Sequence, residues 1–109
     1  MTKKPDYFLC FYVPKSHVEI VKTAVFNAGA GSIGDYRRCA WQVLGQGQFC
    51  PADGSDPFIG EVGGLEVVDE YKVEMVCSAQ DIRSAVNALK AAHPYEEPAY
   101  HVLQIDSGF

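Results

Sequence analysis

The order in which two hydrophobic periodicities follow one another constrains this chain more than any other feature. Runs typical of strands occupy residues 7–13, 35–45, 66–77 and 99–105. Apolar residues at helical spacing occupy residues 17–28 and 82–92. The resulting order β-α-β-β-α-β predicts an α+β fold, a ferredoxin-like sandwich in which a four-stranded antiparallel sheet carries two helices on one face.

Local signals predict where the two helices begin and end. Ser16 with Glu19, and Ser78 with Asp81, have the spacing of capping boxes, in which a side-chain oxygen accepts from a free amide of the first turn. Pro94 follows the second helical stretch and cannot continue it. The sequence "GAGSIG" at 29–34 matches a dinucleotide-binding pattern, but it follows a helix and precedes a strand, so we interpret it as a helix stop and turn.

The segment at about 45–65 is predicted to be a long loop, because it holds six glycines and two prolines. Long ordered loops often carry a function. Phe58 and Glu61 are its candidate ligand-binding residues. Its acidic residues lack the regular spacing of a calcium-binding loop.

Length and charge exclude several classes of protein. The 109 residues suffice for a single domain, 1–109. The net charge of -5 repels phosphate backbones, so nucleic acid is not an expected partner. The apolar run at 8–13 is too short for a signal peptide or a membrane span, which predicts a cytoplasmic protein with no membrane partner. The four cysteines form no CxxC pair, and neither a zinc knuckle nor a redox dithiol is indicated.

The first strand is apolar on both of its faces. Phe8, Cys10 and Tyr12 alternate with Leu9 and Phe11, whereas a strand with one solvated face would alternate with polar residues. Large apolar patches are rarely left in water. We therefore expect the second face to be buried against further copies of the chain, in a homo-oligomer.

The segment "HPYEEPAYHV" at 93–102 concentrates residues that could carry chemistry. One interpretation is structural: its prolines shape a hinge between helix and strand, and its glutamates cap loop amides or pair with Arg37, Arg38 or Lys72. Another is a ligand or partner site that uses His93, Tyr95, Glu96, Glu97 and Arg38. A divalent metal (zinc, copper or iron) could be held by His93, Glu97 and His101, although an extended chain spaces these residues poorly.

Four stretches resemble a known family. They are "GSIGDYRRCAW", "GQGQF", "DPFIGEVGGLEVVDEYKVEM" and "AAHPYEEPAYHV". Together they are similar to the insertion domain of YqfO-type members of the Nif-three-like (NGG1-interacting factor) proteins, and to small stand-alone copies of that domain. The resemblance implies a fold like that of CutA and the PII signalling proteins, which are usually trimeric. Gln46 and Gln48 stand where the relatives commonly have threonine.

The resemblance does not imply an enzyme. In full-length relatives a two-metal centre is built from His-rich motifs in flanking halves, and this chain has three histidines. Three hypotheses remain open. The chain is a small oligomeric binding or regulatory module that requires no cofactor, with a small-molecule or protein ligand; or a divalent-cation binder of the CutA type; or an accessory subunit that docks onto a metal-dependent hydrolase.

Overall fold

The computed structural model describes residues 4–109, which form one antiparallel sheet and two helices. The sheet has the strand order β2-β3-β1-β4, as expected for a ferredoxin-like fold. The elements are β1 (Tyr7–Pro14), a 3-10 turn (Lys15–His17), α1 (Val18–Asn27), β2 (Trp41–Phe49), β3 (Glu66–Cys77), α2 (Ile82–Ala92) and β4 (Tyr100–Gln104).

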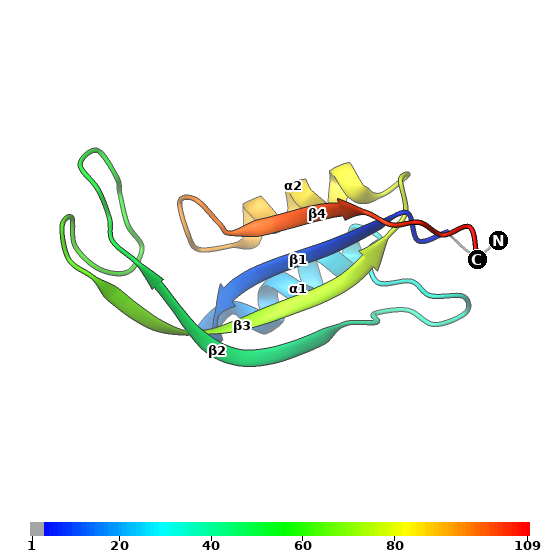
Figure 1. The fold of residues 1–109 in the computed structure, drawn as a ribbon, viewed down its shortest axis with the longest axis horizontal. Helices are drawn as coiled ribbons and strands as arrows, with labels where there is room; N and C mark the ends of the chain where they lie inside the picture. The colour runs from blue at the N-terminus through cyan, green and yellow to red at the C-terminus, as the bar shows by residue number, and fades with distance from the viewer. Residues whose placement is uncertain (1–3) are drawn as a thin grey trace.

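Both helices cover the same face of the sheet (Figure 1). The loop that joins β2 to β3 lies at one end of the molecule, and the C-terminus lies at the other. The short segment between α2 and β4 turns at the same end as the β2–β3 loop. This shared end brings residues about 40 positions apart into contact, since the Asp56 amide bonds the Glu96 carboxylate.

The core lies between the sheet and the helices. Alternate residues of the central strand β1, Leu9, Phe11 and Val13, are fully buried there. They pack with apolar residues of α1 and α2, such as Val21 and Leu89, which are also fully buried. The apolar residues that alternate along the strand and those that recur about every 3.6 positions along the helices therefore pack at one interface, as the sequence predicts.

The opposite side of the sheet, here called the open face, is not covered by either helix. It carries exposed apolar side chains, with Trp41 59%, Val43 43% and Leu103 57% accessible. Register places Trp41 opposite Glu74 and Leu103 opposite Phe8, so all four strands contribute to this face. The observation agrees with the expected second apolar face.

The predicted bounds of the second strand and of the long loop are wrong. Residues 35–40 form no strand, and Arg38 there has a left-handed φ of 57°. β2 instead continues to Phe49, through Gly45 and Gly47, which lie opposite Glu70 and Val68 of β3. Pairing with a long partner strand overrides the low strand propensity of glycine. The irregular loop therefore spans 50–65.

The two capping boxes are also absent. Ser16 lies inside the 3-10 turn, and its hydroxyl bonds the neighbouring ring of His17 instead of a helix amide. At α2 the Ser78 hydroxyl donates to the Asp81 carboxylate, while the Ser78 carbonyl accepts the amides of Asp81 and Ile82. The backbone supplies the cap that the side chain was expected to supply.

The helix stops are where the sequence predicts them. The Gly29 amide donates to the Phe26 carbonyl at 2.9 Å, and Gly29 has a φ of 113° that favours glycine. α2 ends at Ala92, two residues before Pro94. Neither helix in the part of the chain that the structure describes is long and apolar enough to cross a bilayer.

Candidate functional site

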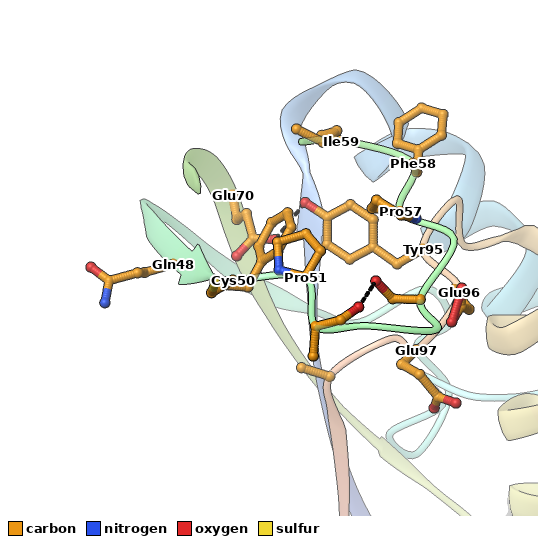
Figure 2. Close-up of a pocket in the computed structure, with 14 residues that line it drawn as sticks. Gln48, Cys50, Pro51, Pro57, Phe58, Ile59, Glu70, Tyr95, Glu96 and Glu97 are labelled. Carbon is orange, nitrogen blue, oxygen red and sulfur yellow. Dashed lines mark hydrogen bonds between the residues drawn. The ribbon is translucent and has the colours of Figure 1, made fainter. Parts of the chain in front are cut away.

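A cavity of about 340 Å³ lies where the β2–β3 loop meets the segment 93–99, here called the hinge. Figure 2 shows the Tyr95 ring in its centre, with Pro57 and Phe58 of the loop beside it. The lining comes from the end of β2 and the loop, from Glu70 of β3 and from the hinge: Gln48, Phe49, Cys50, Pro51, Ala52, Ser55, Pro57, Phe58, Ile59, Glu70, Tyr95, Glu96, Glu97 and Ala99.

His93 anchors the hinge to the sheet and does not face the cavity. Its Nε2 donates to the Tyr12 carbonyl at 2.7 Å, and its Nδ1 accepts the Tyr95 amide at 3.1 Å. The residue is 6% accessible, and this burial lowers the pKa of His93 although the hydrogen bond to the Tyr12 carbonyl favours the charged form. Both ring nitrogens are thus engaged by the backbone, which is the arrangement of a structural histidine.

Tyr95 and Glu70 form the polar pair at the base of the cavity. The Tyr95 hydroxyl donates to Glu70 Oε2 at 2.8 Å, and Figure 2 shows the ring extended toward this carboxylate. Burial first, and the Glu70 carboxylate second, raise the pKa of Tyr95. The hydroxyl therefore stays protonated and serves as a hydrogen-bond donor.

Gly47 makes room for this pair. A Cβ at position 47 would overlap the Glu70 carboxylate, whereas a Cβ at Gly45 would meet no atom within 4 Å. Two glycines on the same strand thus have different roles. The absence of a side chain at Gly47 leaves the space that the Glu70 carboxylate occupies where it bonds Tyr95.

Glu96 joins the hinge to the loop. Its Oε2 accepts the Asp56 amide at 2.7 Å, a contact between two segments that are far apart in the sequence. This confirms the expectation that a hinge glutamate caps a loop amide. Among the described residues, neither hinge glutamate forms an ion pair with Arg37, Arg38 or Lys72: Lys72 Nζ lies 3.2 Å from Glu74 Oε1, and Arg38 donates to the Asn27 side chain.

Aromatic rings from three segments surround Tyr95. Its ring centroid lies 5.9 Å from that of Phe49, 6.4 Å from Phe58 and 4.9 Å from His93. Phe58 also meets His17 edge-on at 5.6 Å. Such contacts hold the loop against the hinge and give the cavity apolar walls.

The structure brings together some of the candidate residues and separates others. Tyr95, Glu96, Glu97 and Phe58 line the cavity. Glu61 does not belong to that lining. Arg38 lies in a second depression of about 650 Å³ after α1, where its guanidinium stands over the Phe26 ring.

The three metal candidates do not converge. His93 is engaged on both nitrogens, and Glu97 lines the cavity. His101 lies on the open face, where register pairs it with Cys10 and its ring meets Tyr12 edge-on. Within residues 4–109 no group of three or more His, Cys, Asp or Glu side chains is placed to hold a metal ion.

The most important residue that sequence reasoning missed is Glu70. It lies in the middle of a regular strand, and nothing in its local pattern separates it from Glu66 or Glu74. One signal was available: a glycine inside a strand marks a site of close approach, and Gly47 lies beside Glu70. The strand register, which sets Gly47 diagonal to Glu70, could not be read from the sequence.

Comparison with known proteins agrees with the four stretches noted above. No family model matches the chain. Over 94 residues it is 50% identical to the GTP cyclohydrolase 1 type 2 homolog of Mycobacterium leprae, and over 98 residues it is 47% identical to that of Bacillus subtilis. The matches cover 86% and 90% of this chain.

A solved structure named as related to NIF3, from Bacillus cereus, superposes on 97% of this chain with a TM-score of 0.80 and 36% identity. Over most of its length, the chain is therefore similar to one part of these NIF3-related proteins. It spans about a quarter of the relatives it matches: 24% of the Mycobacterium leprae protein, 26% of the Bacillus subtilis protein and 27% of the Bacillus cereus structure.

The chain also has the fold of CutA. CutA1 from Shewanella superposes on 98% of this chain with a TM-score of 0.68 at 16% identity, and this chain covers 87% of CutA1. CutA from Archaeoglobus fulgidus superposes with a TM-score of 0.66 at 15% identity. At these identities the likeness concerns the fold alone, and it agrees with the expected CutA/PII-like architecture.

Proposed function

We propose that this NIF3-related domain is a self-associating, non-enzymatic binding module, whose ligand site is the cavity between the β2–β3 loop and the hinge. The cavity carries the proposal, because its walls are tied together before any ligand arrives. Tyr95 bonds Glu70, Glu96 bonds the loop backbone, and the aromatic rings close one side. Ligand sites in proteins are commonly concave, mostly apolar and largely preformed in this way.

The polar groups of the cavity support a binding role and not catalysis. The Tyr95–Glu70 pair resembles a nucleophile with its base, but the raised pKa of Tyr95 opposes formation of a phenolate. Glu96 is held by a backbone amide. These contacts position side chains without activating one of them.

The ligand-site proposal is tested by two-dimensional NMR with a library of small ligands. Binding in the cavity shifts the amide signals of Cys50, Phe58 and Tyr95 together, and leaves those of the second depression, such as Arg38, unchanged. A library of anionic, neutral and cationic compounds that produces no such shift at millimolar concentration would refute the site.

Self-association is proposed to use the open face, in a homotrimer as the family resemblance implies. Three of its apolar residues are between 43% and 59% accessible: Trp41, Val43 and Leu103. Burial of such a patch is worth about 25 cal/mol per Å². The same face holds the Lys72–Glu74 ion pair on β3, which lies beside Trp41 and Val43 of β2 and offers polar contacts within the face.

Native mass spectrometry tests the assembly. The unaltered protein should be a trimer, and Trp41→Asp should be a folded monomer, because a carboxylate on the open face would be buried without a partner. Ile20→Asp is the matched control, since Ile20 is 61% accessible on α1, away from the open face, and should leave the trimer intact. A monomeric unaltered protein would overturn this part of the proposal.

A second candidate function is docking onto a larger protein. It is favoured by the observation that the relatives carry this domain within chains about four times as long. The open face would then be covered by a different protein, and Trp41→Asp would abolish co-purification of that partner while the unaltered domain alone stayed monomeric. The cytoplasmic location remains a prediction.

A further inference from the structure

We infer that the cavity between the β2–β3 loop and the hinge binds an organic cation, an ammonium or guanidinium group carried on a short apolar or aromatic body. The inference rests on the proposed ligand site and names the chemistry of its ligand. It is drawn from the cavity's charge, its aromatic walls and its size together.

The lining carries three carboxylates and no cationic side chain. Glu70, Glu96 and Glu97 contribute the negative charges, and the lining contains no Lys, Arg or His. The donors that hold two of these carboxylates are neutral: the Tyr95 hydroxyl and the Asp56 amide. Hydrogen bonds from neutral donors position a carboxylate without cancelling its charge, so the cavity favours a cationic ligand and disfavours phosphates and carboxylates.

The walls favour an organic cation over a bare metal ion. The ring centroids of Phe49 and Phe58 lie 5.9 Å and 6.4 Å from that of Tyr95, and all three rings line the cavity together with the carboxylates. A cation over an aromatic ring is attracted by the ring quadrupole, and the apolar remainder of the ligand packs on Pro51 and Pro57. A metal ion would use none of this surface, and no metal-binding cluster is present in residues 4–109.

The size sets the scale of the ligand. About 340 Å³ lies at the lower end of the range for small-molecule sites, so the ligand is a compact one. Two sources supply such a group: a free arylalkyl amine, or the Lys or Arg side chain of a peptide. Both share the ammonium-type head and the short apolar body, and the experiment separates them.

The experiment is a titration of the isotope-labelled protein with phenethylamine, followed by NMR at Phe58 and Tyr95. Phenethyl alcohol is the neutral control and phenylacetate the anionic control. We expect phenethylamine to bind at least tenfold more tightly than either, and the blocked dipeptide acetyl-Phe-Lys-amide to reveal whether a peptide side chain binds more tightly than the free amine. Whichever of the amine and the dipeptide binds more tightly, the result supports a cationic ligand.

Three variants test the assignment of the site. Glu70→Gln keeps an acceptor for the Tyr95 hydroxyl but removes the charge, and Glu97→Gln removes the charge of a side chain with no structural bond in the described contacts. Each should weaken phenethylamine binding by about tenfold. Asp106→Asn removes the same charge from an exposed residue that follows β4 and is not part of the cavity lining, and should leave the affinity unchanged.

Two failures are distinguishable. The cation inference would be overturned, and the ligand site kept, if phenethylamine, phenethyl alcohol and phenylacetate shifted the same NMR signals with equal affinity. The same conclusion would follow if zinc chloride or ATP bound tightly and displaced phenethylamine. Absence of any shift from every compound would overturn both the cation inference and the proposed site.

Discussion

The substitution Gly47→Ala tests whether the architecture of the cavity depends on close approach of two strands. The new methyl group would occupy the space of the Glu70 carboxylate, and the flexible end of that side chain would have to move. The Tyr95 hydroxyl would then lose its acceptor in a half-buried position. The backbone at 47 does not have a positive φ, so alanine is otherwise compatible with the strand.

The magnitude follows from two opposing terms. A hydrogen bond to a charged group contributes about 1.5–3 kcal/mol, and we take about 1.5–2 kcal/mol because the pair is half-buried. Replacing glycine by alanine recovers about 0.5 kcal/mol through the unfolded chain. Gly47→Ala should therefore lower the free energy of unfolding by about 1–1.5 kcal/mol.

Gly45→Ala is the matched control, since it adds the same methyl group on the same strand where no atom lies within 4 Å. It should leave stability unchanged or raise it by about 0.5 kcal/mol. Urea unfolding of both variants should show a difference of about 1–2 kcal/mol, and thermal unfolding a difference of roughly 5–10 °C.

A double-mutant cycle separates the lost hydrogen bond from general strain. In a Tyr95→Phe background the bond to Glu70 is already absent, so Gly47→Ala should cost little more than Gly45→Ala. Equal stability of the two alanine variants in the unaltered background would refute the reasoning, and so would an unchanged cost of Gly47→Ala in the Tyr95→Phe background.

Three further predictions follow from the fold and the hinge. Leu89→Ala, a truncation in the fully buried core, should lower the free energy of unfolding by about 2–5 kcal/mol in urea titrations. Burial lowers the pKa of His93 below its ordinary 6.5, so between the folded-state pKa and 6.5 the unfolded chain binds more protons than the folded chain. The free energy of unfolding should therefore fall as pH drops below 6.5 and level off below the folded-state pKa. A His93→Gln variant whose stability depended on pH with the same slope would contradict this. Exposed Cys50 should react first with a neutral maleimide, whereas buried Cys10 and Cys77 should react only on unfolding. Burial also raises the pKa of the Cys10 thiol, which slows its reaction. Loss of this order of reaction in the folded protein would contradict the burial pattern.

The lining of the candidate cavity was predicted in part. The hinge motif identified Tyr95, Glu96 and Glu97, because two prolines and two glutamates in a short segment form an unusual local pattern. The same motif suggested His93 as a ligand, but the Tyr12 carbonyl and the Tyr95 amide occupy both of its ring nitrogens. Whether a polar side chain faces a ligand or the backbone depends on contacts distant in the sequence, and local pattern does not contain them.

The sequence by itself determined the order and type of the elements and the side of each that is buried. These features follow from the periodicity of apolar residues, a property of neighbouring positions. The tertiary structure alone decided that β2 continues through Gly45 and Gly47, because that extension depends on pairing with β3. It also decided that Glu70 joins Tyr95 in the cavity while Arg38 lies elsewhere, since strand register and loop packing set those distances.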